Sequence, residues 1–166
     1  MPAIRYLPPV AVAVSAWRLL RGRLSFPREK VGTILAMEDG EVHAVFREMR
    51  VAPARSAPRD SMAVLRVRFR FASFSPAANR LLSLIPIPVI AGMPGLRRQI
   101  WTFSRESGYS QGIYQFESAD QAGRYRRSPV MRILQRRSVP GSTFHELLRG
   151  TLLEDYLRDL EGRAAG

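Results

Sequence analysis

GYSQGIYQFESADQAGRYRRS, residues 108–128, decides the fold, because it joins a strand to a helix with almost nothing between them. Residues 109–116 are predicted to form a strand that ends at Phe116. Ser118 and Gln121 stand three residues apart, in the relation of a capping box, so a helix begins two residues after the strand ends. So short a junction predicts a domain in which strands and helices alternate along the chain.

A second strand pattern lies upstream, at residues 63–71, where apolar and charged residues alternate strictly. One face carries apolar side chains and the other carries arginines: Leu65, Val67, Phe69 and Phe71 against Arg66, Arg68 and Arg70. This period of two predicts a strand with one apolar face. Ser75 and Pro76 then have the composition of a helix start, and that helix has to end before Pro86.

Two further strands complete the pattern, at residues 97–103 and 139–147. The order strand-helix-strand-strand-helix-strand is the ferredoxin-like β-α-β-β-α-β arrangement, an α+β fold with a four-stranded antiparallel sheet and two helices on one face. The second helix is expected to kink at Pro129. A short C-terminal helix follows, for which Thr151 and Glu154 form another capping box.

The chain before this domain has a different character. Residues 1–27 form an N-terminal arm, and residues 28–51 are predicted to form a hairpin whose turn is Glu38–Gly40. Residues 52–60 are a linker of proline, alanine and arginine without periodicity. The expected division is therefore 1–60 for the arm, hairpin and linker, and 61–166 for the ferredoxin-like domain with its short C-terminal helix.

The apolar run at residues 6–20 of the arm leaves three interpretations open. It is shorter than the roughly 18–20 residues that span a bilayer, and Pro8, Pro9 and Arg18 interrupt it. It could pack on the domain as an amphipathic segment, lie on an anionic membrane surface with Arg18, Arg21 and Arg23 at the headgroups, or be a cleaved signal. We expect a cytoplasmic protein, either free or held peripherally at a membrane by this arm.

Composition excludes several kinds of chemistry. The 166 residues include no cysteine, which removes thiol catalysis, disulfides and thiolate metal sites. His43 and His145 are the only histidines and share no metal-ligand spacing, so no metal site is expected. The net charge of +12 would suit an anionic membrane surface or nucleic acid. However, Lys30 is the only lysine, and such an arginine bias is also what a GC-rich genome produces.

Residues 110–122, SQGIYQFESADQA, also resemble the third strand and second helix of an RNA-recognition module. That family stacks bases on aromatic residues at alternate positions of the strand. Here those positions hold Ile113 and Gln115, while Tyr114 and Phe116 point the other way. Without a stacking platform, nucleic acid is not an expected partner.

Residues 92–118, GMPGLRRQIWTFSRESGYSQGIYQFES, resemble the dimeric α+β barrel superfamily, in its antibiotic-biosynthesis-monooxygenase-like branch. That branch has a loop ending in a Pro-Gly pair, a strand with a central tryptophan, and a GGIY-F strand that leads into a helix. The matching residues occur in the same order and spacing: Pro94, Gly95, Trp101, Gly112, Ile113, Tyr114, Phe116 and Ser118. The resemblance covers about residues 63–147, roughly half of the chain.

The resemblance implies a homodimer whose two sheets pack face to face. The arginine face could then pair with Glu48, Glu117 or Glu146 of either subunit. It also implies a pocket between the sheet and its helices for a hydrophobic small molecule. Its expected walls and anchors are Phe69, Phe71, Met93, Arg98, Trp101 and Phe116, and its expected catalytic residues are Tyr114, Tyr125 and His145. His145 is the natural general base. The same aromatic residues would equally suit a plain hydrophobic core.

Several members of that branch oxidise aromatic, polyketide-like substrates without metal or flavin, so the resemblance implies a cofactor-independent monooxygenase. Two departures weaken narrower assignments. Residues 118–137 contain no histidine, which haem-degrading members carry on this helix, and the first core strand has no asparagine, which several oxidising members use. A cyclase or isomerase on the same scaffold, or a non-catalytic ligand-binding or membrane-associated accessory protein, are the alternatives.

Overall fold

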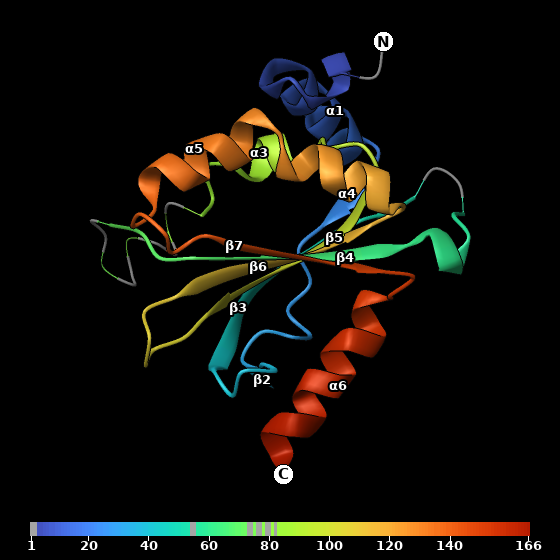
Figure 1. Ribbon diagram of the computed structural model, residues 1–166. Coiled ribbons are helices and arrows are strands. Elements are labelled where there is room, and N and C mark those ends of the chain that lie inside the picture. The colour runs from blue at the N-terminus through green and yellow to red at the C-terminus, as the bar shows by residue number, and fades with distance from the viewer. Residues whose placement is uncertain (1–2, 54–55, 73–74, 76–77, 79–80, 82) are drawn as a thin grey trace.

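A single antiparallel sheet organises the molecule. The computed structural model describes residues 3–166 except 54–55, 73–74, 76–77, 79–80 and 82 (Figure 1). Within this part of the chain the sheet has seven strands: β1 (Leu24–Ser25), β2 (Ile34–Ala36), β3 (Val42–Val51), β4 (Ala63–Phe69), β5 (Leu96–Phe103), β6 (Ser110–Phe116) and β7 (Phe144–Arg149). The order is β1-β3-β5-β6-β4-β7, and β2 pairs with the edge of β3.

Helices lie on both faces of this sheet (Figure 1). They are α1 (Pro8–Leu20), α3 (Ile87–Ile90), α4 (Ala119–Arg126), α5 (Pro129–Arg137) and α6 (Leu153–Ala165), with short 3-10 turns at Ala3–Tyr6 and Arg59–Ser61. We call the face under α1, α3, α4 and α5 the helix side, and the face under α6 the α6 side. Among the described residues, no helix is long and apolar enough to cross a membrane.

The predicted ferredoxin-like α+β core is confirmed. Strands β7, β4, β6 and β5 lie side by side and antiparallel, as this fold requires. Ser118 caps α4 by accepting a hydrogen bond from the backbone N–H of Gln121 at 3.3 Å. The kink at Pro129 is a full break, where Ser128 caps the new helix α5. The helix predicted after Ser75 falls mostly outside the described residues.

Two boundary predictions were wrong. The last strand begins at Phe144 rather than at residue 139, because residues 139–142 form a turn in which the N–H of Ser142 bonds to the carbonyl of Val139 at 2.9 Å. The capping box of the C-terminal helix does not form. Gln115, in the sheet, accepts the hydrogen bond of the Leu153 N–H instead, and this satisfies the start of α6 from outside the helix.

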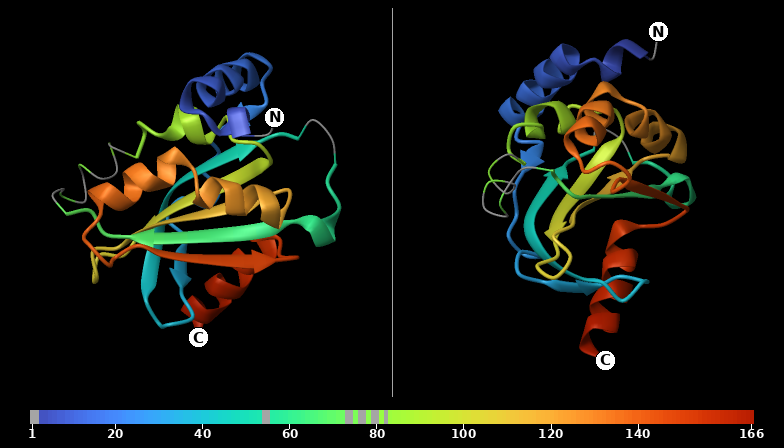
Figure 2. Two further views of the ribbon diagram at one scale, coloured as in Figure 1. Left: turned by 45° about the horizontal axis from the view of Figure 1, so that its top comes forward. Right: turned by 60° about the vertical axis from the view of Figure 1, so that its left-hand side comes forward.

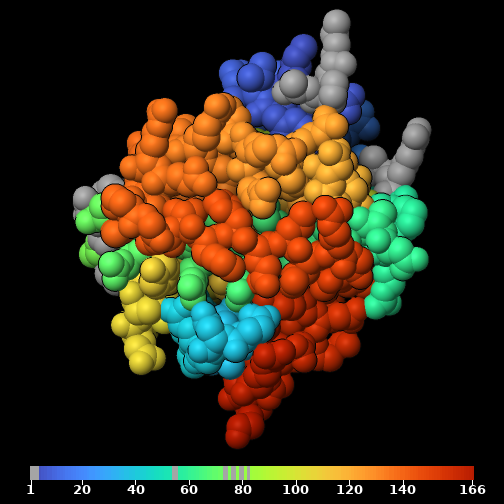
Figure 3. Space-filling view, in the orientation of Figure 1, coloured from blue at the N-terminus to red at the C-terminus, as the bar shows by residue number. Residues whose placement is uncertain are grey.

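The predicted hairpin forms and extends the core sheet. β2 pairs with β3, and β3 pairs with β5 along most of its length, with a bulge between Val45 and Arg47. A bulge increases the local twist of a strand. Figure 2 shows that the sheet curves, so that β3 and β2 turn toward α6, and in Figure 3 the hairpin and α6 lie next to each other on the surface. The α6 side is therefore covered by the chain itself.

Each face of the sheet holds its own apolar core. The helix-side core contains Leu65, Val67 and Phe69, as the alternation of β4 predicts. The α6-side core contains Val64, Ile100 and Ile113 from the sheet, packed against Leu35 and Val45 of the hairpin and against Leu153, Tyr156, Leu157 and Leu160 of α6. Since the strands are buried on both sides, the molecule has three layers, and the sheet is the middle one.

The arginines of β4 pair within the chain. Arg66 contacts Glu38 at 2.9 Å and Glu146 at 2.8 Å, and Arg68 contacts Asp39 at 2.7 Å and Glu41 at 2.9 Å. Glu146 was a predicted partner. The two other predicted partners were wrong, because Glu48 pairs with Arg50 and Arg98, and Glu117 pairs with Arg97. The acidic turn of the hairpin, curved over the sheet, neutralises most of this charge.

Candidate functional site

Aromatic side chains gather between the sheet and α4 on the helix side. The ring of Tyr114 lies 5.1 Å from that of Tyr125 and 6.3 Å from that of Phe116, centre to centre, and Phe69 meets Phe71 edge to face at 4.9 Å. Most of the predicted pocket residues fall in this one cluster: Phe69, Phe71, Met93, Trp101, Tyr114, Phe116 and Tyr125. The rings of Tyr114, Phe116 and Tyr125 fill the space beneath α4, with 3% or less of each exposed.

Gly112 sets the direction of the Tyr114 side chain. A Cβ atom at Gly112 would lie 2.6 Å from the Tyr114 hydroxyl, so the phenol lies along its own strand over this glycine. Gly112 pairs with Val67 on one side and Trp101 on the other. The glycine is therefore the gap in the sheet surface that receives the polar end of Tyr114.

Gln99 and Tyr125 place polar atoms inside this apolar cluster. Gln99 pairs with Tyr114 across the ladder and with Met49 on the other side, so its side chain shares their face. Its amide is fully buried, and within the described part of the chain neither its oxygen nor its nitrogen has a hydrogen-bond partner. The Tyr125 hydroxyl is also buried, and it interacts with the hydroxyl of Tyr114. Buried polar groups without partners are rare in native proteins, and such groups call for an explanation.

Burial also changes the acidity of the two tyrosines. It raises the pKa of Tyr114 to about 12 and the pKa of Tyr125 well above its ordinary value. Both phenols therefore stay protonated at neutral pH. They can donate a hydrogen bond to a ligand oxygen, but neither can act as a base there.

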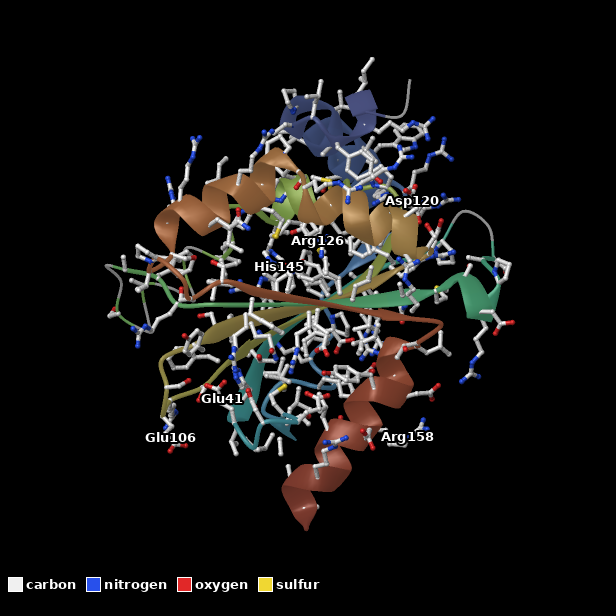
Figure 4. All side chains as sticks on the ribbon, viewed as in Figure 1. Glu41, Glu106, Asp120, Arg126, His145 and Arg158 are labelled. Carbon is white, nitrogen blue, oxygen red and sulfur yellow. The ribbon has the colours of Figure 1, made fainter. Side chains whose placement is uncertain are left out.

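His145 lies on the same face, at the edge strand β7. It pairs with Val67, which in turn pairs with Gly112, so His145 is two strands or about 10 Å from Gly112. Figure 4 shows it on the helix side of β7, below Arg126 of α4. Burial, with a smaller contribution from Arg126, lowers the pKa of His145, so its imidazole is neutral at pH 7. Its Nε2 atom has no partner among the described residues.

Arg98 does not join this cluster. Its guanidinium contacts Glu48 at 2.8 Å and Glu154 of α6 at 2.6 Å. The register places it next to Gln115 rather than beside Trp101, on the α6 side of the sheet. It ties α6 to the sheet, and Gln99, the next residue, takes the helix-side position.

An open cavity of about 580 Å³ lies beside the cluster, between β3, α3 and the segment after β1. The apolar residues that line it are Phe26, Pro27, Val31, Phe46, Leu84, Ile87 and Pro88. Three charged residues, Arg28, Arg47 and Glu48, complete the lining. The guanidinium of Arg47 lies 5.8 Å from the Trp101 ring and links the cavity to the cluster. Burial lowers the pKa of Arg47, although it stays charged at neutral pH.

Sequence reasoning missed Gln99 and Arg47. Gln99 could have been found from strand alternation, because it stands two residues before Trp101 and so shares its face. Arg47 gave no comparable signal, because the pairing of β3 with β5 brings it to Trp101. Arg47 and Trp101 are 54 residues apart in the chain.

A second buried polar group lies on the α6 side. His43 is fully buried, with Nδ1 at 3.1 Å from the Thr102 hydroxyl and Nε2 at 3.3 Å from the Glu41 carboxylate. The order hydroxyl, imidazole, carboxylate resembles a nucleophilic triad, but Thr102 is also fully buried, so no substrate could reach it. Across the described residues, no three His, Cys, Asp or Glu side chains converge as a metal ion needs.

No protein-family model and no curated protein matches the chain. Among solved structures, it is similar to SnoaB, a cofactor-independent oxygenase from Streptomyces nogalater, at 18% identity and a TM-score of 0.44 over 56% of this chain and 94% of SnoaB. It is also similar to LmHde, a heme-degrading enzyme from Listeria monocytogenes, at 12% identity and a TM-score of 0.46 over 76% of this chain and 96% of that one.

A third similar structure is a ferredoxin-fold protein from Listeria monocytogenes related to antibiotic biosynthesis monooxygenases. It is 11% identical, with a TM-score of 0.46 over 70% of this chain and 69% of the other. Each neighbour's activity is a property of that neighbour.

Proposed function

We propose that the protein binds a hydrophobic aromatic small molecule, of polyketide-like character, on the helix side of its sheet and oxygenates it without a cofactor. One observation carries the proposal: Gln99 and His145 place buried polar atoms without partners on one apolar face of the described part of the chain. An apolar surface with a few unpartnered polar groups is what a ligand site for such a molecule needs. The choice of oxygenation rests on the resemblance of residues 92–118.

The chemistry follows from the protonation states. Neutral His145 takes a proton from an activated CH₂ group of the substrate, and the protonated phenols of Tyr114 and Tyr125 donate hydrogen bonds to the enolate oxygen that forms. The carbanion then reacts with dioxygen. The CH₂ group becomes a carbonyl, and the second oxygen atom leaves as water, so dioxygen is the only oxidant required.

The site in this structure is closed, because the rings of Tyr114, Phe116 and Tyr125 occupy the space beneath α4. We propose that the substrate enters through the open cavity at β3. Its apolar walls suit an aromatic ring system, and Arg47 can attract an anionic substituent while it contacts Trp101. The substrate then has to displace part of the aromatic packing to reach Gln99 and the two phenols.

Oxygen uptake with anthrone-type compounds tests this function. We expect uptake that falls at least about a hundredfold in His145→Ala, since a general base contributes two to four orders of magnitude. His43→Gln is the matched control, because it changes the other histidine on the opposite face and should keep the activity. Turnover in strictly anaerobic buffer would instead indicate the cyclase or isomerase. Binding without turnover in either atmosphere would favour a non-catalytic ligand-binding protein.

The homodimer that the resemblance implies stays a prediction. The face that would meet a second sheet carries α6 and the hairpin, whose contacts with the sheet are described above. Sheets could pack face to face only if α6 moved aside. Sedimentation equilibrium of the full chain separates the mass of one 18.7 kDa chain from that of two.

A further inference from the structure

The outward surface of α1 is apolar throughout. Every exposed residue of this helix has an apolar side chain: Pro9, Val12, Ala13, Ala16, Trp17, Leu19 and Leu20. Trp17 is 57% exposed, and Leu20 is 81% exposed. α1 also lies at the outer margin of the molecule, above α3, α4 and α5 (Figures 1 and 3). A surface helix normally has its polar residues outward, so this arrangement is inverted.

The one charged residue of α1 points inward. Arg18 donates hydrogen bonds to the backbone carbonyls of Ala91 and Met93, just beyond α3. Ala11 and Ser15, on the same side of the helix, are buried, and Ala11 packs against the backbone of Gly92. The orientation of α1 is thus held by specific polar and close-packed contacts. The apolar surface is presented by a fixed helix and does not result from a loose one.

Charge is distributed unevenly about this helix. Arg5 precedes α1, and Arg21 and Arg23 follow it; all three are exposed, and residues 3–23 contain no acidic side chain. The guanidinium of Arg21 lies 4.3 Å from the ring of Trp17. The α4–α5 layer on the same side of the sheet, residues 119–137, has six arginines and one aspartate. By contrast, α6 on the opposite side has four acidic residues and two arginines.

We infer that α1 is an interfacial helix, which docks the protein on an anionic lipid bilayer with its apolar surface in the headgroup region. Tryptophan and leucine supply the inserted surface, and the flanking arginines meet lipid phosphates. The 13 residues of α1 span about 20 Å, which suits a helix lying in the plane of the interface. The cationic α4–α5 layer faces the same membrane, while the acidic α6 faces away.

Vesicle co-sedimentation of the full chain tests this inference. We expect the protein to sediment with vesicles of phosphatidylcholine and phosphatidylglycerol and not with phosphatidylcholine alone, and to be released by salt. The Trp17→Ser, Leu20→Ser double variant should bind at least about tenfold more weakly, because it removes two inserted apolar side chains. The control is Ile34→Ser, which changes an apolar residue that is 46% exposed on β2, far from α1.

The electrostatic part has its own test. Arg21→Gln and Arg23→Gln should each weaken binding to the anionic vesicles by about fivefold, whereas Arg158→Gln on α6 should leave it unchanged. Trp17 emission should shift to shorter wavelength on binding, and Trp17→Phe should bind without the shift. Absence of vesicle binding would overturn the inference. The inference would also be overturned if the protein self-associates without lipid and the Trp17→Ser, Leu20→Ser double variant does not. The apolar surface of α1 would then be a contact between two copies of the chain.

Discussion

Two buried glutamines of the same sheet are predicted to respond in opposite ways to the same substitution. Gln99, on the helix side, has no hydrogen-bond partner for its amide within the described residues. Gln115, on the α6 side, is fully engaged: its Nε2 donates to the carbonyls of Ala63 at 3.0 Å and Thr151 at 3.2 Å, and its Oε1 accepts from the Leu153 N–H. Methionine has a similar length and no strong polar group, so it suits both positions.

The expected magnitudes follow from the cost of burying a polar group without a partner. That cost is about 1–3 kcal/mol, so Gln99→Met should raise the free energy of unfolding by about this amount. Gln115→Met should lower it by about 1–3 kcal/mol or more, because the N–H of Leu153 would stay buried without an acceptor. For a chain of this length, each kcal/mol corresponds to about 2–4 °C in melting temperature.

Urea unfolding followed by circular dichroism measures both changes, and oxygen uptake measures the function. Under the proposal, Gln99→Met is more stable and less active than the parent protein, a combination expected where a site is maintained at the expense of stability. If Gln99→Met unfolds more easily by over about 1 kcal/mol, the amide has a partner such as bound water. That result would remove the observation on which the proposed site depends.

Three further predictions concern other positions. Gly112→Ala should lower the free energy of unfolding by about 1–3 kcal/mol and reduce oxygen uptake, because the added Cβ atom would force the enclosed ring of Tyr114 to move. An unchanged midpoint of thermal unfolding would contradict this prediction. Burial lowers the pKa of His43 below its ordinary 6.5, so the unfolded chain binds the proton more readily. Stability should therefore fall as the pH drops below about 6.5, by up to about 1.4 kcal/mol per pH unit, and His43→Gln should flatten urea-unfolding midpoints measured across this range. Gly92→Ala should displace α1, because the added Cβ atom would overlap the backbone of Ala11. Trypsin should then cleave the N-terminal arm faster than in the parent protein, while the core stays intact.

The ferredoxin-like core could be predicted because its signals are local. Alternation in β4 assigned Leu65 and Arg66 to opposite faces, and Ser118 located the start of α4, all from residues close together in the chain. The aromatic cluster followed from the same reasoning, since side chains at alternate positions of adjacent strands share a face. The resemblance of residues 92–118 indicated the same fold.

Long-range contacts were the part that could not be predicted. The ion pairs of Arg66 depend on where the hairpin turn comes to lie, and the start of α6 depends on Gln115, which is thirty-eight residues from Leu153. The inverted orientation of α1 depends on the carbonyls of Ala91 and Met93, which Arg18 reaches only in the folded chain. Local sequence patterns contain no information on such partners.

The sequence alone determined the order of strands and helices in the ferredoxin-like core and which side of the sheet each residue of β4 occupies, because backbone sterics and hydrophobic periodicity act over a few neighbouring residues. Only the tertiary structure decided what covers each side, which polar atoms are left without partners, and which surface of α1 meets the surroundings. Those outcomes depend on segments distant in the chain, whose packing is selected by the free energy of the whole fold.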